Sequence, residues 1–273
     1  MKKSLPLALL AIITLCCFLS GPITGILQVS ATEADILARF QPPSATHWLG
    51  TDELGRDLFA RLLTGGRVSL TVAFLATLIA CTIGTLIGVI AGWRGGIADA
   101  ALMRLTDFLI ALPALPLLII LSAVDIQKLG LAPHANADLY KITLLIALLG
   151  WTTVARLARA RTLTLKKMEF IRAAKALGVK PARIIWRHIL PNVKSTVLVA
   201  AALAAGNIIL VESALSFLGL GIKPPAASWG NMLSNAQDNI WEHASLAIWP
   251  GMMIFITVLS LNFLADAVQE EKG

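Results

Sequence analysis

The sequence predicts an all-α, polytopic membrane protein with six transmembrane helices and both termini in the cytoplasm. Of its 273 residues, 57% are hydrophobic and only 14% are charged, whereas a soluble domain carries about 25% charged residues. The apolar residues are collected in runs long enough to cross the roughly 30 Å of bilayer hydrocarbon. When these runs are threaded through a membrane, most Lys and Arg residues fall on one side, as cytoplasmic segments require.

Five apolar runs have the length of transmembrane helices. Such a helix needs roughly 20 mostly apolar residues, and each run reaches that length with few charged side chains. They cover residues 5–26, 68–92, 102–124, 195–217 and 244–265.

The first run also resembles a cleaved signal peptide, because two lysines precede it. Its apolar stretch continues beyond the roughly 7–15 residues usual for a signal sequence, and no A-x-A cleavage site follows it. We therefore expect it to remain as a transmembrane helix.

The fourth predicted span, residues 141–158, is supported by charge more than by length. Only fourteen uncharged residues separate Lys141 from Arg156. If this segment did not cross, residues 156–194, with eleven Lys and Arg residues and one acidic residue, would lie outside. Because cytoplasmic loops are enriched in Lys and Arg, we predict that the segment crosses with its terminal basic side chains at the two interfaces.

One domain is expected, because no linker-like segment separates two folded units. Residues 1–67 comprise the first transmembrane helix and an external loop. We expect an interfacial helix at 51–61, since Thr51 is a suitable N-cap and acids follow it. Residues 68–265 form a core of five transmembrane helices with a cytoplasmic loop at 156–194, and residues 266–273 form a cytoplasmic tail.

The net charge of +7 is mostly explained by this topology, so it implies contact with membrane lipid and no nucleic acid. The three cysteines lie within apolar runs. They have no metal-ligand spacing with one another or with a histidine, so we interpret them as packing residues.

Motifs for catalysis are missing from the sequence. There is no G-x-x-x-x-G-K-[ST] and no H-E-x-x-H, and the four histidines are scattered. We therefore expect no catalytic residue, no metal site and no cofactor in this chain. Energy for any work would come from a partner protein.

The basic loop at 156–194 has the pattern of two short helices. Residues 169–177 are rich in helix formers and place Phe170, Ala173, Ala174 and Leu177 on one apolar face. Gly178 is a natural C-terminal cap. Pro181 suits the first turn of a second helix, which Pro191 is expected to end. Docking by another protein and attraction to anionic lipid are both compatible with this pattern.

This loop resembles the EAA loop of binding-protein-dependent, ATP-driven (ABC) importers, whose pattern is E-A-A-x₃-G-x₉-I-x-L-P. Five positions match, while Arg172 replaces the Glu and His188 replaces the Ile. The resemblance implies that 169–178 is a coupling helix that docks into a cytoplasmic ATPase. The coupling residues it implies are Glu169, Arg172, Ala173, Ala174, Gly178, Leu190 and Pro191.

Other segments are similar to the dipeptide, oligopeptide and nickel branch of these importers, and to its second, C-type permease. The similarity runs from about residue 48 to 265. Its segments are 49–57 with Arg61, Gly66, Arg67 and Ser69; Met103, Arg104, Asp107 and Pro113; and 215–221, 224–225 and 228–230.

The resemblance implies a type I ABC importer permease in the bacterial inner (cytoplasmic) membrane, working by alternating access. Its implied partners are a second, homologous permease, two cytoplasmic ATPases that bind ATP and Mg²⁺, and an external solute-binding protein. Peptides are the first expected substrate and a nickel chelate the second; a glutathione-like ligand or an antimicrobial peptide is a further alternative. A self-contained secondary transporter or channel and a non-transporting membrane anchor are the rival functions.

Small and proline residues predict packing and bends within the spans. Gly84, Gly88 and Gly92 form a stripe that allows a neighbouring helix to approach closely, either in this chain or in a partner. Pro113 and Pro116 should bend the third span.

Polar residues within the spans are candidates for the translocation path or for structural contacts. Asn207 and Glu212 belong to the fifth span, where polar groups tend to face cavities or hydrogen-bond between helices; with Pro113 and Pro116 they are the candidates for the path. Arg104 and Asp107 are interpreted as a local structural pair. Asp52, Arg56, Asp57 and Trp229 are candidates for contact with the binding protein, and a structural elbow is the alternative for the segment 51–61.

Overall fold

The computed structural model describes residues 4–124 and 137–270, and this part of the chain is a helical bundle with one isolated β-bridge, between Thr51 and Asp57. Its elements are α1 (Ser4–Phe18), α2 (Ser20–Leu27), η1 (Ile36–Ala38), α3 (Leu58–Arg94), α4 (Gly96–Ala111), α5 (Ala114–Ser122), α6 (Ala137–Lys166), α7 (Glu169–Ala176), α8 (Pro181–Ile184), η3 (Ile185–Ile189), α9 (Leu190–Phe217), α10 (Trp229–Ala236), η4 (Gln237–Asn239) and α11 (Ser245–Glu270).

Long apolar helices account for six crossings if two bent pairs are each counted as one span. Four helical stretches, α3, α6, α8 to α9, and α11, are long and apolar enough to span a membrane singly. The pairs α1–α2 and α4–α5 are bent by 65° and 82° and meet the same test together. These six segments correspond to the six predicted spans, including the weakly apolar fourth one.

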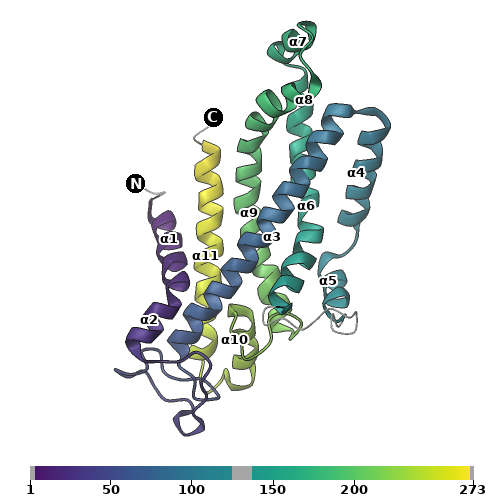
Figure 1. Cartoon of the computed structure of the whole chain (residues 1–273). Coiled ribbons are helices and arrows are strands. Elements are labelled where there is room, and N and C mark those ends of the chain that lie inside the picture. Colours follow the sequence, from purple (N-terminus) through teal and green to yellow (C-terminus); the bar gives the residue numbers. More distant parts are fainter. Residues whose placement is uncertain (1–3, 125–136, 271–273) are drawn as a thin grey trace.

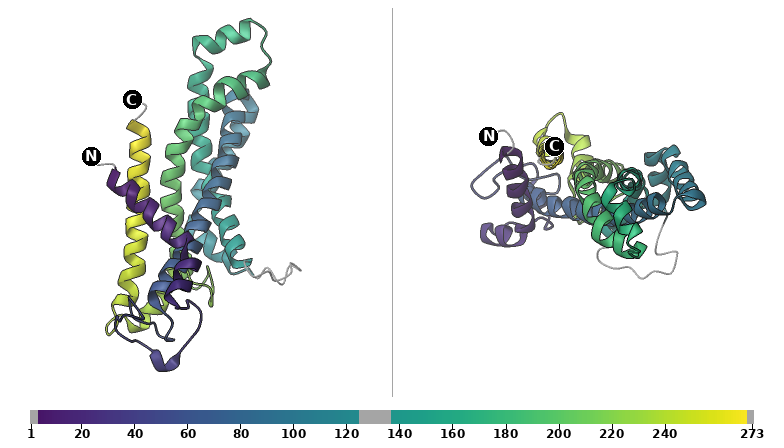
Figure 2. Two further views of the ribbon diagram at one scale, coloured as in Figure 1. Left: turned by 60° about the vertical axis from the view of Figure 1, so that its left-hand side comes forward. Right: turned by 90° about the horizontal axis from the view of Figure 1, so that it is seen from above.

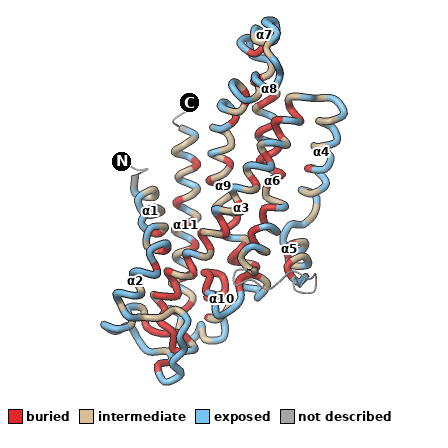
Figure 3. Tube along the Cα trace, in the orientation of Figure 1, coloured by how far each residue is buried: buried red, intermediate tan, exposed pale blue. Residues whose placement is uncertain are grey.

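The bundle has two distinct ends (Figures 1 and 2). The α7 end carries the short helix α7 and the turn between α3 and α4, and both termini point toward it. The α10 end carries α10 and the long loop between α2 and α3. Burial is concentrated along α3 and α6 and at the α10 end, whereas α7 and most of α4 are exposed (Figure 3).

The predicted glycine stripe lies in a close contact between α3 and α6. A Cβ atom placed on Gly84 would lie 2.6 Å from the Trp151 carbonyl oxygen, and one placed on Gly88 would lie 2.3 Å from the Ala155 carbonyl oxygen. Both carbonyls belong to α6. The neighbour of the stripe, which also includes Gly92, is therefore within this chain, and the glycines allow two backbones to touch.

The predicted bend of the third span is present. Leu112 is extended, as the residue before a proline prefers to be. Pro113 then precedes the first residue of α5, and Pro116 lies inside that helix. Lys141 of α6 donates hydrogen bonds to the Ser122 and Val124 carbonyl oxygens at the end of α5.

The predicted interfacial helix at 51–61 is wrong. Thr51 and Asp57 instead form an antiparallel bridge around a turn, and Asp57, rather than Thr51, caps a helix, accepting a hydrogen bond from the Ala60 N–H at 2.7 Å. Residues from Leu58 onward are the first turns of α3. Both Thr51 and Asp57 are good N-cap residues, so the local pattern did not distinguish them.

The prediction that Pro191 ends a helix is also wrong. The helix runs without a break from Pro181 to Phe217. Just before the proline, η3 is a π-helical turn in which the Leu190 N–H bonds to the Ile185 carbonyl oxygen. A wider π turn accommodates an added residue inside a helix, and here it lets the chain pass a proline that lacks an N–H.

Candidate functional site

The short helix α7, predicted to be a coupling helix, is held at its end of the bundle by one buried side chain. Ile171 is fully buried and packs in a cluster with Leu165 and Ile184, which lie on the helices that flank the loop. Val179 packs against the same cluster. Burying an aliphatic side chain contributes about 1.5–3 kcal/mol, so this contact fixes which way the short helix faces.

The opposite side of α7 is apolar and exposed. Phe170 and Leu177 are 44% and 83% exposed, and the exposed Ala173 lies between them on the same face. Ala174, predicted on this face, instead packs toward the cluster around Ile171. Ile171 was not predicted to be buried, although its spacing of three residues from Ala174 places the two on one side of a helix.

The turn after α7 has the local structure that its sequence predicts. Gly178 adopts a positive φ of 73°. Its N–H bonds to the Lys175 carbonyl oxygen at 3.0 Å, and the Val179 N–H bonds to the Ala174 carbonyl oxygen at 3.1 Å. These are the two bonds of a Schellman cap. Pro181 then occupies the first turn of α8.

Two lysines connect the coupling region to the end of α3. The Lys175 ammonium lies 4.6 Å from the centre of the Trp93 ring, a cation–π distance. Lys166 donates a hydrogen bond to the Trp93 carbonyl oxygen at 2.6 Å. Through Lys175, α7 is therefore in contact with the end of α3.

The other residues predicted to take part in coupling lie on α7 and at the start of α9. Glu169 starts α7, and Arg172 is exposed beside its apolar face. The His188 ring centre is 6.0 Å from that of Phe170. Leu190 and Pro191 form the first turn of α9, away from the exposed face of α7.

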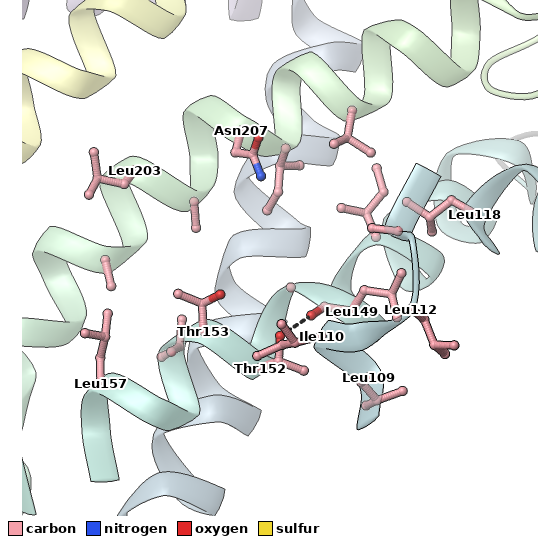
Figure 4. Close-up of a pocket in the computed structure, with 18 residues that line it drawn as sticks. Leu109, Ile110, Leu112, Leu118, Leu149, Thr152, Thr153, Leu157, Leu203 and Asn207 are labelled. Carbon is pink, nitrogen blue, oxygen red and sulfur yellow. Dashed lines mark hydrogen bonds between the residues drawn. The ribbon is translucent and has the colours of Figure 1, made fainter. Parts of the chain in front are cut away.

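A second candidate site is a cavity of about 480 Å³ between α4, α5, α6 and α9 (Figure 4). Its wall is mostly aliphatic, and Asn207, Thr152 and Thr153 supply its polar side chains. The Thr152 hydroxyl already donates to the Leu149 carbonyl oxygen at 2.9 Å. The lining residues are Leu109, Ile110, Leu112, Ala114, Leu118, Ile146, Leu149, Gly150, Thr152, Thr153, Val154, Leu157, Ala200, Leu203, Ala204, Asn207, Ile208 and Val211.

The four predicted path residues are not brought together. Asn207 lines the cavity, whereas Pro113 and Pro116 only create the bend beside it, since their neighbours Leu112 and Ala114 form the wall. Glu212 lies elsewhere, fully buried and hydrogen-bonded between helices.

The α4 helix is tied to α6 by ion pairs. Asp99 forms two hydrogen bonds with Arg159, at 2.5 and 2.7 Å. Asp107 pairs with Arg156 of α6, 49 residues away, so the local pair predicted between Asp107 and Arg104 is wrong.

The predicted contacts for a binding protein are buried, which contradicts their assignment as a surface. Asp52, Arg56, Asp57 and Trp229 are at most 3% exposed. Asp52 pairs with Arg56 at 2.7 Å and with Arg61 at 3.1 Å, so these residues form the structural elbow. Burial and the neighbouring Asp52 carboxylate raise the pKa of Glu53 in the same loop.

Among residues 4–124 and 137–270, no three His, Cys, Asp or Glu side chains gather closely enough to hold a metal ion.

Known transport proteins are similar to this chain in sequence. Residues 84–270 match the family model described as binding-protein-dependent transport system inner membrane component. The dipeptide transport system permease protein DppC of Alkalihalophilus pseudofirmus is 37% identical over 272 residues, covering 99% of this chain and 86% of that protein. The oligopeptide transport system permease protein OppC of Bacillus subtilis is 33% identical, covering 86% of this chain and 74% of that protein.

A glutathione transport system permease protein, GsiD of Pectobacterium atrosepticum, is 38% identical and covers 84% of this chain and 72% of that protein. Among solved structures, an inward-facing MetNI methionine ABC transporter matches with a TM-score of 0.61, at 19% identity, over 78% of this chain and 97% of that chain. This last likeness is one of fold.

Proposed function

Because the chain belongs to the family of binding-protein-dependent transport system inner membrane components, we propose that it forms one half of a peptide translocation path. It is a membrane-spanning permease subunit of an ABC importer, a family of transport proteins rather than enzymes. The names of its relatives support dipeptides or oligopeptides as the substrate, and glutathione, itself a short peptide, falls in the same class.

The observation that carries the coupling role is the exposed apolar face of α7. A patch formed by Phe170, Ala173 and Leu177 stands at one end of the bundle on a helix anchored from behind by Ile171. Exposed apolar patches on anchored elements are typical of docking sites. We assign the α7 end to the cytoplasm and this face to contact with an ATPase subunit.

The proposed complex follows from that orientation. Two cytoplasmic ATPases bind ATP and Mg²⁺ and drive alternating access through α7. A second, homologous permease completes the path, and a solute-binding protein delivers substrate at the α10 end. The membrane is the bacterial inner membrane.

The cavity lined by Asn207 is the proposed share of the path in this chain. Among the described residues, no charged side chain lines its aliphatic wall, so a passing peptide would meet no strong ionic attraction from these residues. The Asn207 carboxamide both donates and accepts hydrogen bonds and matches a peptide backbone in both respects.

Uptake by the complete complex in vesicles tests the coupling role. Leu177→Asp places a carboxylate in the docking face and should reduce ATP-driven uptake at least about tenfold, because an unpaired charge in a contact costs several kcal/mol. Ile97→Asp is the matched control, since Ile97 is 89% exposed at the same end but on α4.

The rival functions give different outcomes in the same vesicles. Uptake driven by an ion gradient without ATPase subunits would establish a secondary transporter. Binding of the ATPase without any uptake would establish a membrane anchor. Equal uptake by Leu177→Asp and the parent would remove α7 from the coupling step.

A further inference from the structure

Glu212 is a fully buried carboxyl group that neither coupling nor the cavity uses. It lies on α9 near the α10 end, with none of its surface exposed. Within residues 4–124 and 137–270, no Lys, Arg or His forms a salt bridge with it. Burying an ionisable side chain within a membrane-spanning helix costs free energy. The hydrogen bonds that offset this cost therefore indicate what the side chain does.

Two serine hydroxyls occupy the two carboxyl oxygens. Ser69 of α3 donates to Oε2 at 2.9 Å, and Ser216, one turn further along α9, donates to Oε1 at 2.7 Å. The contact with Ser69 joins residues 143 positions apart, and it is a direct polar link between α3 and α9.

Each serine then accepts a backbone N–H from the segment that follows α9. The Trp229 N–H donates to Ser69 Oγ at 3.3 Å, and the Ile222 N–H donates to Ser216 Oγ at 3.1 Å. Glu212 is thus the centre of a chain of hydrogen bonds that reaches both ends of residues 222–229. We call Glu212, Ser69 and Ser216 the carboxyl hub.

Around the carboxyl hub, α10 packs closely against α3 and α9. The Trp229 ring is fully buried, and its Nε1–H donates to the Leu62 carbonyl oxygen of α3 at 3.0 Å. A Cβ on Gly230 would lie 2.5 Å from the Ser213 carbonyl oxygen of α9, and one on Gly66 would lie 2.7 Å from the Trp229 ring. The glycines permit the approach, and the hub supplies the directional bonds.

We propose that Glu212 is a positioning residue that fastens α10 and its preceding loop to α3 and α9, so that these elements move as one body when the α10 end of the path opens and closes. The joint movement during transport rests on the proposed function, whereas the attachment of α10 to α3 and α9 does not. Removing the hub should free residues 218–236 and let ATP hydrolysis proceed without transport.

Hydrogen–deuterium exchange and transport, both measured on the complete complex in vesicles, test the proposal. Glu212→Ala should accelerate amide exchange in 218–236 at least about tenfold, because a lost buried hydrogen-bond network favours local opening. It should also lower the uptake per ATP hydrolysed at least about fivefold. Exchange in α7, at the other end of the bundle, should not change.

Variants of Glu212, Ser69 and Ser216 distinguish a positioning role of the hub from a general loss of stability. Glu212→Gln keeps one acceptor oxygen, and its amide N–H can donate to the other serine if that hydroxyl turns to accept, so this variant should recover most of both readouts. Ser69→Ala should speed exchange around Trp229 but not around Ile222, and Ser216→Ala should do the reverse. These two variants give the answer even if Glu212→Ala fails to assemble. Asp238→Asn, an exposed acid on η4, is the control and should match the parent.

Several results would overturn the inference. One is a Glu212→Ala complex whose amide exchange and uptake equal those of the parent. Another is an equal loss in Glu212→Gln and Glu212→Ala. A third is Ser69→Ala or Ser216→Ala speeding exchange equally around Trp229 and around Ile222. A parent complex without ATP-driven uptake would instead count against the proposed function, and the exchange measurements would still decide whether the carboxyl hub fastens α10.

Discussion

Single residues in this chain decide which way short segments face. Ile171 is the clearest case, because α7 has only eight residues and a helix of that length is not stable on its own. Its orientation depends on one aliphatic anchor that is completely enclosed. The exposed side then presents Phe170 and Leu177 to a partner.

Truncating the anchor should loosen α7 without touching its exposed face. Ile171→Ala is expected to cost about 2–5 kcal/mol locally, since it leaves a cavity where the side chain packed. Amide exchange in residues 169–178 should accelerate, and binding to the ATPase should weaken. Leu177→Ala is the comparison: it should leave exchange unchanged, because surface truncations cost about 0.5 kcal/mol or less, yet weaken ATPase binding. If amide exchange in residues 169–178 of Ile171→Ala were as slow as in the parent, Ile171 would not be the anchor of α7.

At the scale of elements, α3 and α6 form the centre of the bundle. Their contact is made by glycines on α3 and by backbone carbonyls and small side chains on α6. Ion pairs from Asp99 and Asp107 then hold α4 against the outer side of α6. The bent pairs α1–α2 and α4–α5 are added around this centre.

A methyl group in the glycine stripe should force these two helices apart. Gly88→Ala puts a Cβ where the Ala155 carbonyl oxygen lies 2.3 Å away, and overpacking of this kind costs about 1–3 kcal/mol. The thermal midpoint of the purified chain in detergent should fall by several degrees. Gly21→Ala has nothing within 4 Å of the new methyl and should not lower it. Equal midpoints for the two variants would show that α3 and α6 are not in close contact.

At the scale of the whole molecule, long helices join the α7 end to the α10 end. α3 runs for 37 residues, from the carboxyl hub near α10 to Trp93 beside α7. A motion that begins at α7 therefore has a continuous element through which it reaches the opposite end. This arrangement suits a subunit that converts cytoplasmic work into a change at the external face.

Labelling with a membrane-impermeant maleimide tests the orientation of the molecule. Trp241→Cys, at a residue 96% exposed at the α10 end, should react in intact cells. Leu177→Cys should react only in inside-out vesicles. The parent serves as the control, because Cys16, Cys17 and Cys81 lie within helices of the bundle. Reaction of Leu177→Cys from outside would reverse the topology and exclude a cytoplasmic ATPase at α7.

The six apolar helical segments and the local structure of the loop between α6 and α9 could be predicted from the sequence, because both depend on local signals. The length of an apolar run, the position of basic residues and the glycine after a short helix are each read within about 30 neighbouring residues. The proline bend in the third span belongs to the same class. Where two local signals were equivalent, as with Thr51 and Asp57, the prediction was wrong.

Only the tertiary structure decided which residues meet across the chain. It showed that the glycine stripe faces α6, that Asp107 pairs with Arg156, that Asp52 and Trp229 are buried, and that Glu212 bonds to Ser69 from 143 residues away. These contacts depend on how the helices are rotated and stacked, which is set by the packing of all of them together. A buried carboxyl group and a surface one look alike in a sequence, and they differ only in what the folded chain places around them.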